Sequence, residues 1–203
     1  DIPDLIAILA LAEKYNAYII IDEAHSVGVL GDRGEGLCQS LGVEKRIFLR
    51  LITFGKGVGS HGAIALAHGE VIDYLVNFAR SFIYTTAPSL EVVATFLAAY
   101  ELLPNLAFRE KLRENIAFFQ RKVQEFAVKN TREIHFIPSQ SPIQGLIIPD
   151  NERLKKLSDS LQSQGIGVKP IFSPTVPKGQ ERLRICLHSF NTKEEIEKLF
   201  KNI

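Results

Sequence analysis

Two polar segments, each at the end of an apolar run, carry the residue types that could perform chemistry. Asp22 and His25 follow the run AYIII, and Thr53 and Lys56 lie at the end of the run IFLRLITF. A lysine amine can form a Schiff base with an aldehyde, a carboxylate can keep a ring nitrogen protonated, and a hydroxyl can contact a phosphate. These residue types together predict a site for an aldehyde cofactor.

Pyridoxal 5′-phosphate (PLP) is the cofactor that needs such a set, because it uses a lysine Schiff base and a carboxylate on its pyridinium nitrogen. Lys56 would supply the Schiff base and Asp22 the carboxylate. His25 could donate a hydrogen bond to the phenolic oxygen of the ring, and Thr53 could contact the phosphate. A lone lysine in a glycine-rich loop is ordinarily solvated, so the prediction depends on all four residues.

The letters DEAH at residues 22–25 are also a nucleotide-hydrolysis signature of helicases. There the acidic residues hold Mg²⁺ beside ATP, and an earlier GxxxxGK[ST] loop binds the phosphates. No such loop precedes Asp22. The pair Gly55–Lys56 has Arg50 where the first glycine would stand and no Ser or Thr after the lysine. An ATP-binding module is therefore the weaker alternative.

The composition excludes several classes of protein. The 203 residues are 46% hydrophobic and 23% charged, enough to bury a sizeable core. The 24 basic and 23 acidic residues nearly cancel, which is against a nucleic-acid partner. Cys38 and Cys186 form no CxxC motif, so we expect no disulfide framework and a reducing, cytoplasmic setting. No apolar run approaches the about 20 residues of a membrane span, so we expect no membrane partner.

The first half of the chain has the pattern of an α/β protein. Apolar residues at helical spacing and apolar runs alternate along it. The expected elements are a helix from Pro3 to Tyr15, strands at residues 17–22, 47–54 and 63–67, and a helix at residues 71–79. Three consecutive isoleucines, Ile19 to Ile21, indicate a strand covered on both faces, as in a parallel sheet.

The second half begins with helical periodicity from Ser89, which continues on both sides of Pro104. Beyond these two long helices we expect strands at residues 143–148, 167–172 and 182–189, and a helix at residues 152–164. Thr192 with Glu195 predicts a capping box for a last helix. We therefore expect one domain at residues 1–104 and a second, with its linking helix, at residues 105–203.

Four segments of the chain, in this order, resemble the α-oxoamine synthases, which are fold-type I PLP enzymes: DEAHSVGVLGDRGEG, TFGKGVGSHGA, ARSFIYTTAPS and PTVPKGQERLRI. The resemblance implies an aspartate-aminotransferase-like transferase fold. Residues 1–104 would then be the remainder of a large PLP-binding domain with a mainly parallel sheet, and residues 105–203 a small α+β C-terminal domain. It also implies a homodimer with a shared active site.

Carried over by position, the resemblance makes Lys56 the Schiff-base lysine and general base. Asp22 becomes the partner of the pyridinium nitrogen and His25 the contact to the ring oxygen, so that all three belong to the catalytic set. Thr53 becomes a phosphate contact. Thr85 or Thr86 would reach the phosphate of the neighbouring subunit.

Arg184 matches the arginine with which this family holds the substrate carboxylate. In the run RLRICLHS, strand alternation places Arg182, Arg184, Cys186 and His188 on one face. By that pattern alone both arginines could simply line a solvated surface. Only the motif makes Arg184 a substrate-binding residue, for which a planar two-pronged donor is suited.

The implied reaction joins an amino acid to an acyl thioester with loss of CO₂. The wording TFGKG favours the branch that joins L-alanine to pimeloyl-CoA or pimeloyl carrier protein, while the glycine-using and serine-using branches stay open. No metal is expected, because the histidines lack metal-ligand spacing: His61, His68, His135 and His188.

Enzymes of this family are nearly twice as long as this chain. The chain begins Asp-Ile-Pro and contains no methionine, so we expect a preceding portion with the glycine-rich phosphate loop and the residue that stacks on the cofactor. The 203 residues alone would then be inactive or lack tightly bound cofactor. A non-catalytic fragment is the remaining alternative.

Overall fold

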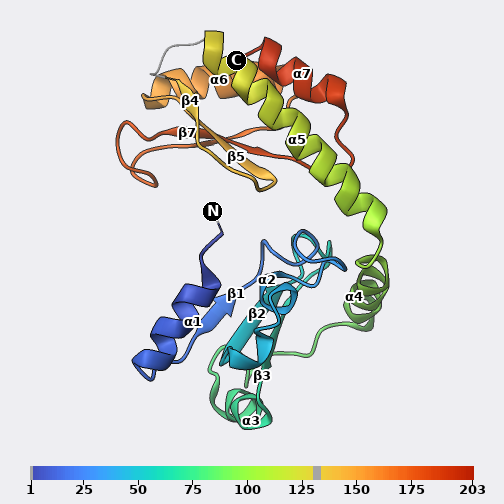
Figure 1. The fold of residues 1–203 in the computed structure, drawn as a ribbon. Helices are drawn as coiled ribbons and strands as arrows, with labels where there is room; N and C mark the ends of the chain where they lie inside the picture. Colours follow the sequence, from blue (N-terminus) through green and yellow to red (C-terminus); the bar gives the residue numbers. More distant parts are fainter. Residues whose placement is uncertain (1, 130–133) are drawn as a thin grey trace. The chain divides into compact units, whose positions relative to one another are not determined.

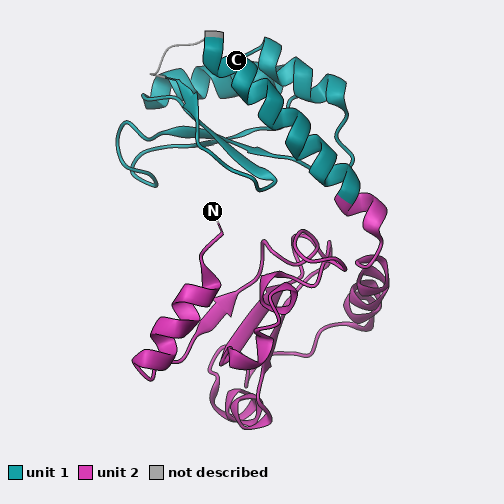
Figure 2. Cartoon of the chain, viewed as in Figure 1, with its two compact units in different colours: residues 1, 110–203 teal, residues 2–109 magenta. Residues whose placement is uncertain are grey.

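The chain is described by a computed structural model at residues 2–129 and 134–203, which form two compact units (Figure 1). The N-terminal unit comprises residues 2–109 and the C-terminal unit residues 110–203 (Figure 2). The division falls inside helix α5 (Leu106–Lys129), five residues beyond the boundary expected after residue 104. Pro104 does not mark the boundary between the units. It stands just before the first turn of α5, where a proline does not interrupt the helix.

The N-terminal unit is built on a three-stranded sheet with the strand order β1-β2-β3. Each helix and strand expected in this part of the chain is present, and α2 and a 3-10 turn are additional. In chain order the elements are α1 (Leu5–Lys14), β1 (Ile20–Asp22), α2 (Leu37–Ser40), the 3-10 turn (Glu44–Arg46), β2 (Leu49–Thr53), β3 (Ala63–Ala67), α3 (Gly69–Phe78) and α4 (Leu90–Leu102).

The direction of β3 differs from the mainly parallel sheet that was expected. β1 and β2 are parallel, whereas β3 is antiparallel to β2. A parallel neighbour requires a crossover of a dozen or more residues. The segment between Thr53 and Ala63 is too short for one, so the chain turns back directly.

Apolar side chains pack helices against the sheet of this unit. Leu5 and Leu9 of α1 are buried against Cys38, and Phe96 of α4 lies 4.2 Å from Phe54, between ring centroids. Ile20, in contrast, is 61% exposed. The run of isoleucines therefore does not form a strand covered on both faces, as had been expected, because no apolar cluster of the unit includes Ile20.

The C-terminal unit has a four-stranded antiparallel sheet with the strand order β4-β5-β7-β6. The expected strands and helices are present, together with the short strand β4. The elements after α5 are β4 (His135–Phe136), β5 (Ile143–Ile147), α6 (Asn151–Ser163), β6 (Lys169–Ile171), β7 (Arg182–Cys186) and α7 (Lys193–Lys201).

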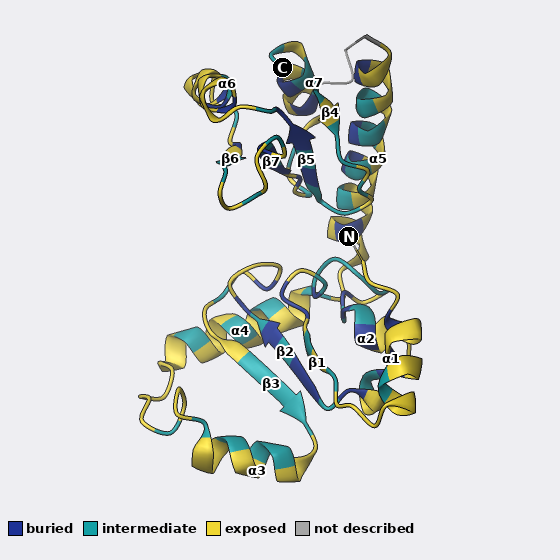
Figure 3. Ribbon diagram, turned by 90° about the vertical axis from the view of Figure 1, so that its left-hand side faces the viewer, coloured by how far each residue is buried: buried dark blue, intermediate teal, exposed yellow. Residues whose placement is uncertain are grey.

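Helices α5, α6 and α7 lie on one face of this sheet (Figure 1) and share its core. Leu183 of β7, Phe119 of α5 and Leu154 of α6 are all fully buried there. Figure 3 shows buried segments in β5 and along α5. Thr192 and Glu195 form the expected capping box at the start of α7. The helical periodicity of the sequence thus fixes which side of each helix is buried, and the alternation along β7 fixes which face of the sheet carries Arg184.

Within the described ranges, no single helix is long and apolar enough to cross a membrane; α4 and α5 have the necessary length and composition only when this bent pair is counted together.

Candidate active site

The carboxyl ends of β1 and β2 bring three of the predicted site residues to one edge of the N-terminal sheet. Asp22 is the last residue of β1 and Thr53 the last residue of β2. The parallel register pairs Asp22 with Leu51, and side chains two residues apart on a strand share a face. Asp22 and Thr53 therefore lie on the same face, and Lys56 follows in the next turn.

The Asp22 side chain is exposed and held in a local turn. Its Oδ1 accepts a hydrogen bond from the N–H of Ala24 at 2.8 Å. The turn continues to His25, whose side chain is exposed. A carboxylate fixed at one oxygen by its own backbone presents the other oxygen in a defined direction.

The loop after β1 and the lysine loop after β2 are in direct backbone contact. A Cβ placed on Gly57 would lie 2.3 Å from the carbonyl oxygen of Val27, and a Cβ on Gly28 would lie 3.3 Å from the Cα of Gly57. Only glycine allows two backbones to approach this closely. The contact places the residue after Lys56 against the residues after His25, so the two polar segments form one surface.

Glu23, the residue after Asp22, is buried, and the sequence pattern predicted no role for it. Its Oε1 accepts hydrogen bonds from the Ser26 hydroxyl at 2.9 Å and the Cys38 N–H at 3.0 Å. Its Oε2 accepts a bond from Nε of Arg50 at 2.7 Å, and the two side chains are 1% and 8% exposed. Burial alone would raise the pKa of Glu23, but these hydrogen bonds and the charge of Arg50 hold the pKa below its ordinary value.

A signal for this pair was present in the sequence. Arg50 is the one charged residue inside the run IFLRLITF, and a charge within a buried strand needs a buried partner. The sequence does not indicate which acidic residue this is; the structure shows that it is Glu23, which directly follows β1. The pair joins the turn that carries Asp22 to the middle of β2.

Arg109 fixes the other end of the glycine-rich loop. It is 3% exposed, and its guanidinium donates to the carbonyl oxygens of Leu103 and Asp32. These acceptors lie at the end of α4 and in the loop that follows β1. Arg109 was also missed, because neither acceptor is a side chain and the contact with Asp32 spans most of the unit.

The residues at this edge fit the phosphate and ring of PLP. Oγ1 of Thr53 is buried and has no hydrogen-bond partner among the described residues. A buried hydroxyl left in this state costs about 1–3 kcal/mol, so a phosphate oxygen there would satisfy it. Asp22, on the same face, has a carboxylate suited to a protonated ring nitrogen, and Lys56 has an exposed amine.

Thr85 and Thr86 lie on the exposed segment that follows α3. Oγ1 of Thr85 donates a hydrogen bond to the carbonyl oxygen of Phe82 at 2.7 Å. The proton of Thr85 is thus used within its own turn, whereas no hydrogen bond of the Thr86 hydroxyl is shown in the described part of the chain.

Arg184 belongs to the C-terminal unit, on the face of β7 opposite to the helices. The neighbours Leu183 and Ile185 are buried, as the alternation predicted, and Arg184 is half-buried. Its Nε atom is buried without a hydrogen-bond partner among the described residues. The side chain therefore has an unused donor that a carboxylate could accept from.

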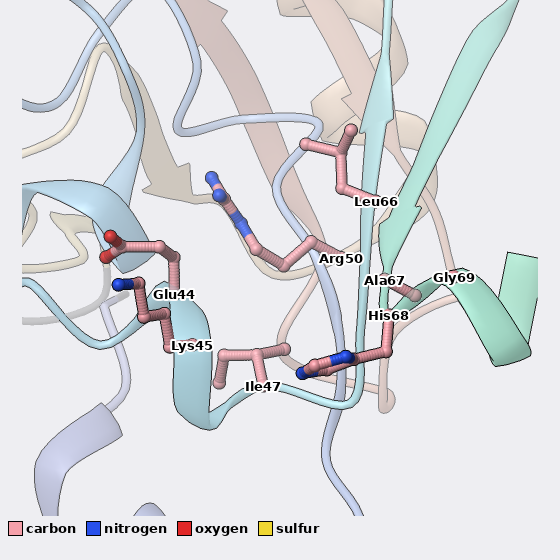
Figure 4. Close-up of a pocket in the computed structure, with 8 residues that line it drawn as sticks. All are labelled: Glu44, Lys45, Ile47, Arg50, Leu66, Ala67, His68 and Gly69. Carbon is pink, nitrogen blue, oxygen red and sulfur yellow. The ribbon is translucent and has the colours of Figure 1, made fainter.

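The histidines and acidic residues do not gather as a metal site: the described residues contain no group of three or more His, Cys, Asp or Glu that could hold an ion. A surface pocket, shown in Figure 4, lies elsewhere. Ile47, Arg50, Leu66 and His68 are among its lining residues, which places it at the opposite strand ends from Lys56. Its Glu44 and Lys45 belong to the 3-10 turn before β2, away from the ends of β1 and β2 that carry Asp22 and Thr53.

The two cysteines are expected to differ sharply in reactivity toward a thiol reagent. Cys38 is fully buried, and burial, followed by the nearby Glu23, raises its pKa to about 11. Because the thiolate is the reactive form, Cys38 should stay unmodified near neutral pH while the exposed Cys186 reacts. Labelling with iodoacetamide and peptide mapping checks this; equal labelling of both thiols in the folded protein would contradict it.

Known proteins are similar to this chain over most of its length. The 8-amino-7-oxononanoate synthase of Emericella nidulans is 44% identical in an alignment of 196 residues that covers 93% of this chain and 46% of that protein. The chain thus spans about half the length of the curated relatives it matches.

Two solved structures share the fold. The structure of 8-amino-7-oxononanoate synthase from Francisella tularensis has a TM-score of 0.80 and 29% identity, covering 95% of this chain and 56% of that one. A structure of serine palmitoyltransferase (SPT) with PLP has a TM-score of 0.88 and 25% identity, covering 100% of this chain and 50% of that one.

These likenesses confirm the expected fold, that of the fold-type I PLP-dependent transferases. Residues 1–203 match the family model of aminotransferase class I and II. The match spans both units, so the chain belongs to the aminotransferase class I and II family.

Proposed function

We propose that the protein is a PLP-dependent acyltransferase of the α-oxoamine synthase type. It would join L-alanine to pimeloyl-CoA or pimeloyl carrier protein, with loss of CO₂, to give 8-amino-7-oxononanoate for biotin synthesis. The observation that carries the proposal is the register of β1 and β2, which puts Asp22 and Thr53 on one face directly before Lys56. The relative at 44% identity supports the choice of substrates.

The residues of the N-terminal unit have distinct roles in this proposal. PLP supplies an electron sink for the electrons released at the α-carbon of the amino acid. Lys56 would hold the cofactor through its amine and, once the amine of the amino acid has displaced it, would be the base that receives the α-proton at Nζ. Asp22 keeps the proton on the ring nitrogen, and His25 donates a hydrogen bond to the ring oxygen. Thr53 donates its unpaired hydroxyl proton to the phosphate.

The remaining assignments concern the substrate and a second subunit. Arg184 holds the carboxylate of the amino acid. In a cytoplasmic homodimer with a shared active site, Thr86 reaches the partner's phosphate; Thr85 is the poorer donor because its proton is bonded to Phe82. Residues 1–104 would belong to the PLP-binding domain and residues 105–203 to the small domain.

Trapping the cofactor tests the proposal at Lys56. Borohydride makes any linkage between a lysine amine and the PLP aldehyde permanent, so even a weakly populated linkage is detected. After treatment with PLP and borohydride, peptide mapping is expected to find most of the label on Lys56. The exposed loop lysine Lys178 should carry little of it, because it lies outside the N-terminal unit and far in the chain from Asp22 and Thr53.

The control is the variant Lys56→Ala, in which the label should be lost without transfer to a neighbouring lysine. Label spread evenly over the surface lysines of the unmodified chain would contradict the proposed function.

The choice of substrates needs a separate measurement. The serine-using reaction is the alternative, and the similarity to the SPT structure, with a TM-score of 0.88, supports it. Release of CoA should be fastest with L-alanine and pimeloyl-CoA. Faster release with L-serine and palmitoyl-CoA, or with glycine and acetyl-CoA, would replace the proposed substrates while leaving the PLP chemistry in place.

A further inference from the structure

Two cationic side chains lie directly opposite each other on the helix-free face of the C-terminal sheet. The antiparallel register of β6 and β7 pairs Lys169 with Arg184. Residues opposite each other on neighbouring strands point to the same face, with Cβ atoms about 4.5–5.5 Å apart. Lys169 is exposed and Arg184 half-buried.

No carboxylate within the described residues compensates this pair. The salt bridges that the structure shows there involve neither side chain. The residue paired with Arg184 on its other side, in β5, is Gly145, which brings no charge. Nε of Arg184 is buried and without a hydrogen-bond partner among the described residues.

The Lys169–Arg184 pair destabilises the sheet unless an anion binds to both side chains. Like charges placed directly opposite on a sheet destabilise it, and a buried donor without an acceptor adds to the cost. Both costs disappear when a carboxylate accepts bonds from the two side chains. Arginine provides a planar fork for both oxygens, and lysine adds a compact point charge.

We propose that Lys169 is a second carboxylate-binding residue, acting together with Arg184. The inference rests on the proposed function in one respect, namely that Arg184 contacts a substrate carboxylate. The new element is a second positive charge at this site, that of Lys169. With two positive charges, the site selects carboxylates over neutral analogues of the same shape. Both proposed substrates possess such a group: L-alanine at its α-carbon and the pimeloyl chain at its far end.

Binding of small carboxylates to the whole chain tests the role of Lys169. L-alanine and pimelate are titrated separately, with L-alaninamide and pimelamide as the matched analogues that lack a carboxylate. The NMR signals of the Arg184 Nε–H and of the backbone amides of residues 169 and 184 report binding. The carboxylate that saturates at the lower concentration identifies which substrate uses the site, and we expect neither analogue to saturate.

Four variants separate the contributions of charge and position. Lys169→Gln and Arg184→Gln should each weaken carboxylate binding by roughly fivefold or more, as loss of a charged hydrogen bond implies. Lys169→Arg should retain binding within about twofold, because it keeps a positively charged donor opposite Arg184. Lys178→Gln, on the exposed connection between β6 and β7, is the matched control and should have no effect.

The thermal unfolding midpoint without ligand distinguishes a binding role of Lys169 from a structural one. Replacing a lysine that stabilises the fold would lower the midpoint. Lys169→Gln should raise the midpoint or leave it unchanged, because it removes the repulsion from Arg184. A lowered midpoint, or carboxylate binding within twofold of the unmodified chain, would overturn the role of Lys169.

The outcomes also distinguish the inference from the proposed function. If Lys169→Gln is without effect while Arg184→Gln weakens binding and Lys56 is labelled by PLP, only the inference fails. If both variants weaken binding but Lys56 takes no label, the carboxylate site stands and the proposed function fails.

Discussion

Replacing Glu23 with alanine is expected to destabilise the N-terminal unit by about 3–5 kcal/mol, the usual cost of removing one partner of a buried ion pair. The guanidinium of Arg50 would stay buried without its carboxylate, and the Ser26 hydroxyl and the Cys38 N–H would lose their acceptor. Urea unfolding followed by circular dichroism measures the loss.

The same unit contains a matched control. Arg46 donates through Nε and Nη2 to one carboxylate oxygen of Glu13, at 2.9 and 2.7 Å, but these side chains are 40% and 63% exposed. Glu13→Ala should therefore cost only about 0–1 kcal/mol. A Glu23→Ala variant that loses no more stability than Glu13→Ala would show that burial of the pair has no energetic importance.

The stability supplied by Glu23 should also depend on pH in a defined direction. Its pKa in the folded protein is lowered from the ordinary value of 4.5. A carboxyl group with a lowered pKa contributes stability above its ordinary value and loses that contribution as the pH falls through the lowered one. The difference between Glu23→Ala and the unmodified chain should therefore be full at neutral pH and shrink in acid.

Cys38 offers a local readout of the same change. Its N–H is bonded to Glu23, and its thiol is fully buried. If Glu23→Ala opens the turn behind Asp22, iodoacetamide should label Cys38 at neutral pH, which it should not do in the unmodified chain. Loss of stability with Cys38 still protected would mean that the turn keeps its position without the ion pair.

Much of the fold could be predicted because it depends on local periodicity. The amphipathic stripe of α5, the capping box at Thr192 and the alternation along β7 each involve residues close in the sequence. The antiparallel direction of β3 follows from the segment between Thr53 and Ala63, which is too short for the crossover that a parallel neighbour needs. The strand β4 has two residues, too few for a period.

The candidate site likewise has residues that the sequence could predict and contacts that it could not. Asp22 and Lys56 could be selected because each ends an apolar run, and such runs end where α/β sheets place ligands. The pairing of Glu23 with Arg50, the carbonyl contacts of Arg109 and the pairing of Lys169 with Arg184 depend on strand register or loop approach. One sequence alone does not contain that information, because a shift of one residue would reverse every face.

Gly57→Ala is expected to separate the lysine loop from the loop that follows Asp22. The added Cβ would lie 2.3 Å from the carbonyl oxygen of Val27, and a backbone atom cannot move aside as a flexible side chain can. Overpacking of this kind costs about 1–3 kcal/mol. More importantly, Lys56 would be displaced together with Gly57, so its labelling by PLP and borohydride should fall strongly.

Gly55→Ala is the matched control on the other side of the same lysine. The nearest atom to its added Cβ is the carbonyl oxygen of Ser60, at 3.9 Å, which is an ordinary contact. This variant should unfold at nearly the same urea concentration and keep the label on Lys56. If both variants retain the label, the close approach of the two loops does not position the lysine; if both lose it, backbone freedom around Lys56 matters more than the contact at Val27.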